Sequence, residues 1–85
     1  MGSRRVVLIH SSALGHGVEE ADAVYAAEHF LYSAPESDES PMPEFRLGFD
    51  GHGRLLEIVV LVFDSGNVML IHAMKARKKY WSLLG

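Results

Sequence analysis

A histidine and a group of cations lie close together near the end of this 85-residue chain. His72 comes first, and four cations follow within seven residues, namely Lys75, Arg77, Lys78 and Lys79. Histidine suits proton transfer because it gains and loses its proton near neutral pH. Lysine and arginine bind phosphate, and arginine can hold it at two points. The segment therefore predicts a site in which His72 acts as acid or base and Arg77 stabilises charge, while Lys75, Lys78 and Lys79 bind phosphate.

Three further residues extend this candidate site. Arg54 begins an apolar strand and is predicted to point to the same surface, so it joins His72 and Arg77 as a candidate catalytic residue. Arg46 lies on the polar side of the preceding strand and is a candidate to join the phosphate-binding group. Tyr80 follows the cations and is able to stack on a base.

Each assignment has a structural alternative. His72 alternates with apolar neighbours and would then be a half-buried structural histidine, while Arg46 and Arg54 would be solvated strand residues. Tyr80 and Trp81 would pack on the sheet, which is the expectation for Trp81. No metal site or cofactor is predicted, because the remaining histidines show no ligand spacing.

The hydrophobic pattern places these residues in one domain spanning residues 1–85. We expect an α+β fold, in which a small antiparallel sheet packs against one main helix. That sheet would combine an N-terminal strand with a C-terminal three-stranded meander. The expected elements are a strand within Arg4–His10, a helix over Val18–Leu31, strands over Glu44–Asp50, Arg54–Phe63 and Val68–Met74, and a short helix over Lys75–Leu84. Residues 33–43 contain three prolines among polar residues and are expected to be a mobile loop.

Composition narrows the class of protein. The chain has no cysteine, which excludes disulfides and a thiolate nucleophile. Its longest apolar run, Ile58–Phe63, is six residues, too short for a membrane span, so we expect a cytoplasmic protein with no membrane partner. Residues 1–3 are expected to be a tag remnant.

Charge is distributed unevenly along the chain. The net charge is −3, yet residues 18–45 hold eight of the eleven acids and no lysine or arginine. The basic segment near the end contains half of the basic side chains. This asymmetry predicts one anionic and one cationic face, unless both are simply solvated.

Three stretches of the chain resemble the BrnT-like toxins of the RelE/ParE superfamily. They are His16-Gly17-Val18 with the acids that follow, residues 53–60 and residues 70–80. Members of that family show a His-Gly-Val segment opening a helix, a Gly-Arg strand, a hairpin, and a strand that runs into a basic helix. The resemblance implies a RelE-like fold and the toxin of a bacterial type II toxin–antitoxin system. It also implies metal-independent cleavage of messenger RNA through the ribose 2′-hydroxyl, and a cognate antitoxin as protein partner.

The chain departs from the family pattern in two places. The basic N-terminal helix common in the family is shortened here to Ser11–Gly17. Met74 stands where the family has an arginine at the end of a strand. With the net negative charge, this favours an alternative of another class, a non-catalytic RelE-like interaction module that binds a protein partner. The apolar strand Ile58–Phe63, if poorly covered, would favour a homodimer.

Overall fold

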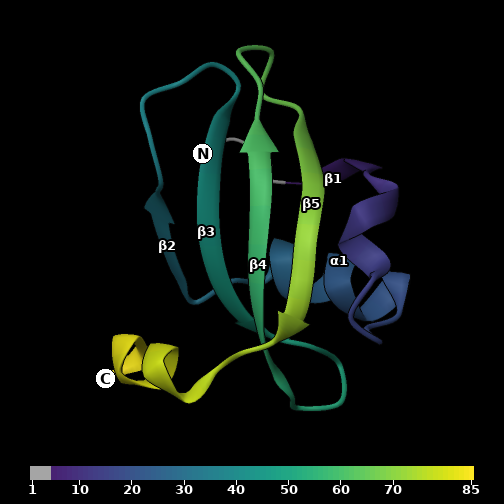
Figure 1. The fold of residues 1–85 in the computed structure, drawn as a ribbon, viewed down its shortest axis with the longest axis vertical. Helices are drawn as coiled ribbons and strands as arrows, with labels where there is room; N and C mark the ends of the chain where they lie inside the picture. The colour runs from purple at the N-terminus through teal and green to yellow at the C-terminus, as the bar shows by residue number, and fades with distance from the viewer. Residues whose placement is uncertain (1–4) are drawn as a thin grey trace.

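The computed structural model describes residues 5–85, which form a five-stranded sheet with the order β1-β5-β4-β3-β2 (Figure 1). β1 runs parallel to β5, and every other neighbouring pair is antiparallel. The predicted tag remnant at residues 1–3 lies outside the described residues. The strands are β1 (Val6–Ile9), β2 (Tyr32–Pro35), β3 (Met42–Phe49), β4 (Leu55–Val62) and β5 (Val68–Lys75).

Tight turns join the three long strands. After β3, the Asp50 carboxylate accepts hydrogen bonds from the backbone N–H groups of His52 (2.8 Å) and Arg54 (2.9 Å). Between β4 and β5, Gly66 takes a φ of 92° and its N–H donates to the carbonyl of Phe63 at 2.8 Å. Glycine reaches this left-handed conformation without a Cβ clash, so the chain reverses within a few residues.

One face of the sheet is covered by α1 (Glu20–Glu28) and flanked by the 3₁₀ helix η1 (Ser11–Leu14), and we call it the α1 face (Figure 1). The helix turns its small residues Ala23, Ala26 and Ala27 to the sheet, all fully buried. Small side chains let the helix backbone approach the strands closely, which leaves the larger Val24 and Tyr25 facing outward. The strands contribute Leu56, Ile58, Val60, Val68, Leu70 and Ala73 to this core.

The opposite face, which we call the η2 face, is partly covered by the C-terminal 3₁₀ helix η2 (Lys78–Leu84). Tyr80 and Leu84 of η2 pack on a second, smaller core of Phe45, Leu47 and Leu55. Residues alternate between the two faces along each strand, so Glu57 and Val59 of β4 lie on the η2 face. In the β4–β5 register, His72 lies opposite Val59. The sheet therefore brings His72 and Glu57 together on this face.

The prediction of a RelE-like antiparallel sheet packed against one main helix is wrong. The sheet is mixed and has five strands, and the only α-helix within residues 5–85 is nine residues long. The first and last strands, β1 and β5, are neighbours in the sheet although they lie near opposite ends of the sequence. Because no hairpin joins them, nothing forces an antiparallel pairing, and β1 lies parallel to β5.

The second correction concerns the segment expected to be a loop. Tyr32–Pro35 pairs with β3 as the edge strand β2, so part of residues 33–43 belongs to the sheet. Proline is tolerated there because an edge strand leaves one row of N–H groups unused. Near the end of the chain, Lys75 still belongs to β5, and the expected helix begins only at Lys78 and is 3₁₀ rather than α. Within the described residues, no helix is long and apolar enough to cross a membrane.

Candidate functional site

The structure joins two of the predicted site residues, His72 and Arg77, through a third that the sequence did not reveal, Glu57. His72 Nε2 lies 3.5 Å from Glu57 Oε2, and the two side chains are 30% and 3% exposed. Arg77 holds the same carboxylate at two points, with Nε 3.0 Å from Oε1 and Nη2 3.0 Å from Oε2. The backbone N–H of Arg77 also donates to Oε1 at 3.1 Å. A buried carboxylate is thus fixed between an imidazole and a guanidinium.

Glu57 keeps its negative charge in this setting. Burial by itself raises the pKa of the Glu57 carboxyl, but the side-chain and backbone hydrogen bonds from Arg77 outweigh it, and the pKa falls below its ordinary value. The same contact raises the pKa of Arg77. The ionised Glu57 carboxylate contacts the His72 ring at 3.5 Å, so Glu57 is a candidate positioning residue for His72.

A second histidine completes the group. The rings of His16 and His72 meet edge to face, with centroids 5.3 Å apart and planes inclined by 68°. His16 lies in the exposed segment between η1 and α1, and Gly17 beside it has a φ of 77°. Two adjacent imidazoles can act as acid and base on one substrate. In the sequence, His16 stood out only as part of the His16-Gly17-Val18 segment, since nothing in that segment pointed to a residue so distant in the chain.

Arg54 is held by acids rather than by the residues of this group. Its Nε donates to Asp50 Oδ2 at 2.7 Å, and its Nη2 donates to Asp22 Oδ2 of α1 at 3.2 Å. His52 Nδ1 is 3.3 Å from the second oxygen of Asp22. The structure therefore does not bring Arg54 to His72, because both acids that hold it belong to the α1 side.

The group around Arg54 also contains the residues with metal-ligand spacing. Ligand atoms of Asp22, Asp50 and His52 lie within 4.8 Å of one another. Arg54 bonds both carboxylates, so a guanidinium already balances their charge. A divalent cation would have to displace Arg54, and we assign no metal to this group.

Arg46 lies in the interior of the protein. Its side chain is fully buried on the α1 face, where Nε donates to Glu44 at 2.7 Å and Nη1 to the carbonyl of Ala27 at 2.9 Å. The guanidinium stacks 4.5 Å from the ring centroid of Phe30. Strand alternation correctly separated Arg46 from Phe45, but α1 ends over that polar side and shields it from solvent. Arg46 therefore joins the end of α1 to β3 and does not reach RNA from this position.

Replacing Arg46 with methionine tests this structural role. The change keeps most of the apolar volume but removes two hydrogen bonds and a buried charge, so we expect the free energy of unfolding to fall by about 2 kcal/mol. Affinity for RNA should not change, because the guanidinium is inaccessible. Urea unfolding and filter binding measure the two quantities, and a loss of RNA affinity in a folded variant would contradict the assignment.

The remaining predicted residues lie on η2 and at the end of β5. Lys78 and Lys79 are exposed on η2, and Lys79 Nζ lies 5.1 Å from the ring centroid of Tyr80. Tyr80 itself stacks against Phe45, with centroids 4.7 Å apart, so it is part of the second core. Lys75 pairs with Leu56, a residue of the α1-face core, and therefore starts on the face opposite His72. Arg77 contacts Glu57 and so joins the His72 group, while Lys78 and Lys79 follow it in sequence on η2.

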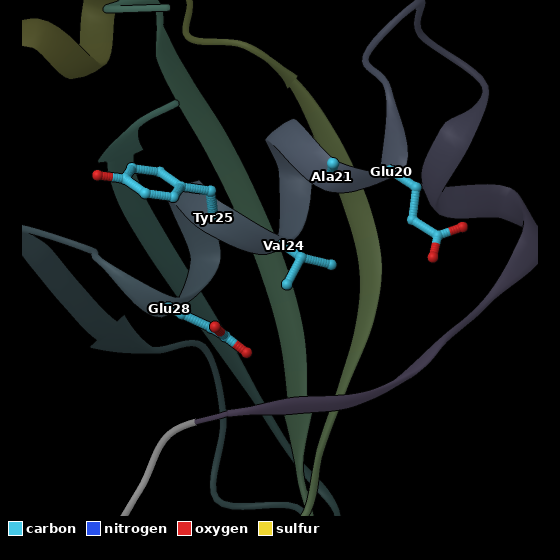
Figure 2. A pocket seen from close by; sticks show the side chains of 5 residues that line it. All are labelled: Glu20, Ala21, Val24, Tyr25 and Glu28. Atoms are coloured by element: carbon cyan, nitrogen blue, oxygen red, sulfur yellow. The ribbon is translucent and has the colours of Figure 1, made fainter. Parts of the chain in front are cut away.

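A shallow hollow lies on the outer side of α1, and its charged lining residues are acidic. Figure 2 shows the side chains that line it, Glu20, Ala21, Val24, Tyr25 and Glu28. Glu28 also accepts a hydrogen bond from the backbone N–H of Val6 at 2.9 Å, which attaches β1 to the helix. Two carboxylates beside apolar groups would repel a phosphate backbone, so the hollow does not suit nucleic acid.

Two of the buried carboxylates, Asp50 and Glu57, predict a loss of stability in acid. Burial raises the pKa of Asp50, but hydrogen bonds from Arg54 and His52 outweigh it, so Asp50 and Glu57 both have pKa values below the ordinary 3.8 and 4.5. The unfolded chain then binds protons more readily than the folded chain, and the stabilisation is present above these ordinary values. It is lost as the pH falls through the lower, folded values. Urea midpoints should be steady near neutral pH and drop below about pH 4.5; a flat profile down to about pH 3 would contradict both pairings.

Comparisons with known proteins add no further constraint. No protein-family model matches the chain, and neither a curated protein nor a solved structure matches it.

Proposed function

We propose that the chain is a metal-independent endoribonuclease that cleaves RNA through the ribose 2′-hydroxyl. The observation that carries the proposal is the pair of adjacent imidazoles, His16 and His72, with His72 held by a buried and ionised Glu57. Cleavage of this kind needs a base, an acid and stabilisation of the phosphate charge, and it needs no nucleophile from the protein. The two histidines supply the first two requirements without a metal ion.

The reaction assigns one role to each group. His72 takes the proton from the 2′-hydroxyl, and its imidazolium is stabilised by Glu57 as the positive charge develops. The O2′–P bond forms, the P–O5′ bond breaks, and protonated His16 gives its proton to O5′. The products are a 2′,3′-cyclic phosphate and a 5′-hydroxyl. Arg77, which is 54% exposed although it binds Glu57, and the neighbouring lysines stabilise the charge on the phosphate.

The biological setting follows from the resemblance. Residues 16–18, 53–60 and 70–80 resemble BrnT-like toxins, which supports the role of a toxin in a type II toxin–antitoxin system of a bacterial cytoplasm. Messenger RNA would be the substrate and a cognate antitoxin the protein partner. Met74 replaces the family arginine and lies opposite Glu57, and the guanidinium that binds this carboxylate comes from Arg77 instead.

Induced expression tests this proposal in cells. Wild-type chain should arrest growth and deplete bulk messenger RNA, whereas a His72→Gln variant expressed to the same level should do neither. Normal growth with intact transcripts, from a wild-type chain that is soluble and folded, would contradict the ribonuclease.

Normal growth with intact transcripts would favour the alternative, a non-catalytic module that binds a protein partner. The hollow on α1 is the observation in its favour, because it places exposed apolar surface, including a Tyr25 that is 45% exposed, between two carboxylates. Such a surface suits a partner segment that is both apolar and cationic. An antitoxin and a second copy of the chain are both partners that this alternative allows.

A further inference from the structure

The indole of Trp81 is more exposed than its size predicts. The sequence suggested a core position, but Trp81 is 58% exposed. Its neighbours Tyr80 and Leu84 supply the contacts that hold η2 on the sheet. The indole Nε1–H donates to the carbonyl of Ala76 at 3.4 Å, which links the ring to the residue beside Arg77. The helix is thus anchored without Trp81, and a large aromatic surface remains in contact with solvent.

The surroundings of Trp81 are cationic. Arg77, Lys78 and Lys79 precede it within the same segment, and no acid follows Asp64 in the sequence. Arg77 connects this segment directly to Glu57, and Glu57 approaches His72. An exposed aromatic ring beside phosphate-binding cations is the combination that binds single-stranded nucleic acid.

We propose that Trp81 stacks on one unpaired base, so that the ribonuclease acts on single-stranded RNA; this inference rests on the proposed function. In a duplex the bases stack on each other and present no free face to an indole. Stacking tolerates any base, because every base has a π face, so little sequence preference is expected at this position. The cations hold the backbone beside the stacked base, in the segment where Arg77 binds Glu57.

Fluorescence provides the test, because Trp81 is the only tryptophan in the chain. The probe is a 2′-O-methyl oligouridine of about ten nucleotides, which binds like RNA but has no free 2′-hydroxyl and is not cleaved. We expect it to quench the emission of Trp81. A duplex of the same length, and an abasic oligonucleotide with the same phosphates, should bind more weakly and leave the emission largely unchanged. Equal quenching by the abasic strand would overturn the stacking assignment.

Two variants separate stacking from charge. Affinity for a labelled oligouridine, measured by anisotropy, should fall about tenfold in Trp81→Ala and much less in Trp81→Phe, which keeps a ring. Both variants should fold, because the indole contributes little to the core. Unchanged affinity in Trp81→Ala would overturn the inference, even if the wild type cleaves RNA. Conversely, quenching and a tenfold loss without any cleavage would keep the binding inference and reject the enzyme.

Discussion

Replacing His72 with glutamine should lower the rate of RNA cleavage by about a hundredfold to ten-thousandfold, the usual contribution of a positioned acid or base. Glutamine keeps a polar side chain that can still contact Glu57, but it cannot accept and release a proton near neutral pH. The half-exposed position of His72 means that the fold should survive the change. Initial rates on a fluorescent single-stranded RNA, with folding checked by circular dichroism, measure the effect.

His29→Gln is the matched control for this variant. His29 is also exposed, but it lies at the end of α1, where its ring contacts Tyr25 and no site residue. Its replacement should leave the cleavage rate within about twofold of the wild type. If His72→Gln cleaved as fast as His29→Gln, the assignment of His72 as the proton-transfer group would be wrong.

Replacing Gly48 with alanine should cost more stability than any other single change considered for this chain, more than about 3 kcal/mol. A Cβ at this position would overlap the carbonyl oxygen of Ala26 and lie 3.1 Å from its carbonyl carbon and 3.2 Å from the Cα of Phe30. All three atoms belong to the backbone of the α1 segment, which no rotamer change can move. The helix would have to lift from β3, and a domain of this size has little stability to spare.

Gly51, in the turn after β3, offers a control in which the same glycine-to-alanine change is made. A Cβ on Gly51 meets no atom within 4 Å, so Gly51→Ala should change the free energy of unfolding by less than about 0.5 kcal/mol. Thermal and urea unfolding of the two variants give the comparison. Equal stability of Gly48→Ala and Gly51→Ala would show that α1 does not pack as closely on β3 as the structure has it.

The sequence located the long strands but not their wider arrangement. Alternation in β3 and the apolar run in β4 are local signals, so both strands lie within a residue or two of their expected bounds. The parallel pairing of β1 with β5 depends on contacts between the two ends of the domain, and no local pattern encodes it. The edge strand β2 was hidden by its proline and by the acids that follow it.

The sequence predicted only part of the candidate site, because only some of its residues give a local signal. His72 and Arg77 stood out because histidine and arginine occur beside other cations in one short segment. Glu57 did leave a signal, as the only charged residue within β4, which is otherwise apolar. A lone acid in a central strand needs a charged partner, and Arg77 supplies it. Arg46 and Arg54 show the opposite outcome, because both were predicted site residues and both are held by acids instead. Glu44 binds Arg46, while Asp50 and Asp22 bind Arg54.

The central claim is that this chain itself cleaves RNA by proton transfer between two histidines. The most direct test incubates purified protein with a single-stranded RNA in the presence of EDTA and identifies the chemical ends of the products. We expect 2′,3′-cyclic phosphate and 5′-hydroxyl ends, formed at a rate that shows a bell-shaped dependence on pH and is lost in His72→Gln. No cleavage by folded wild-type protein, or cleavage that His72→Gln retains, would contradict the account.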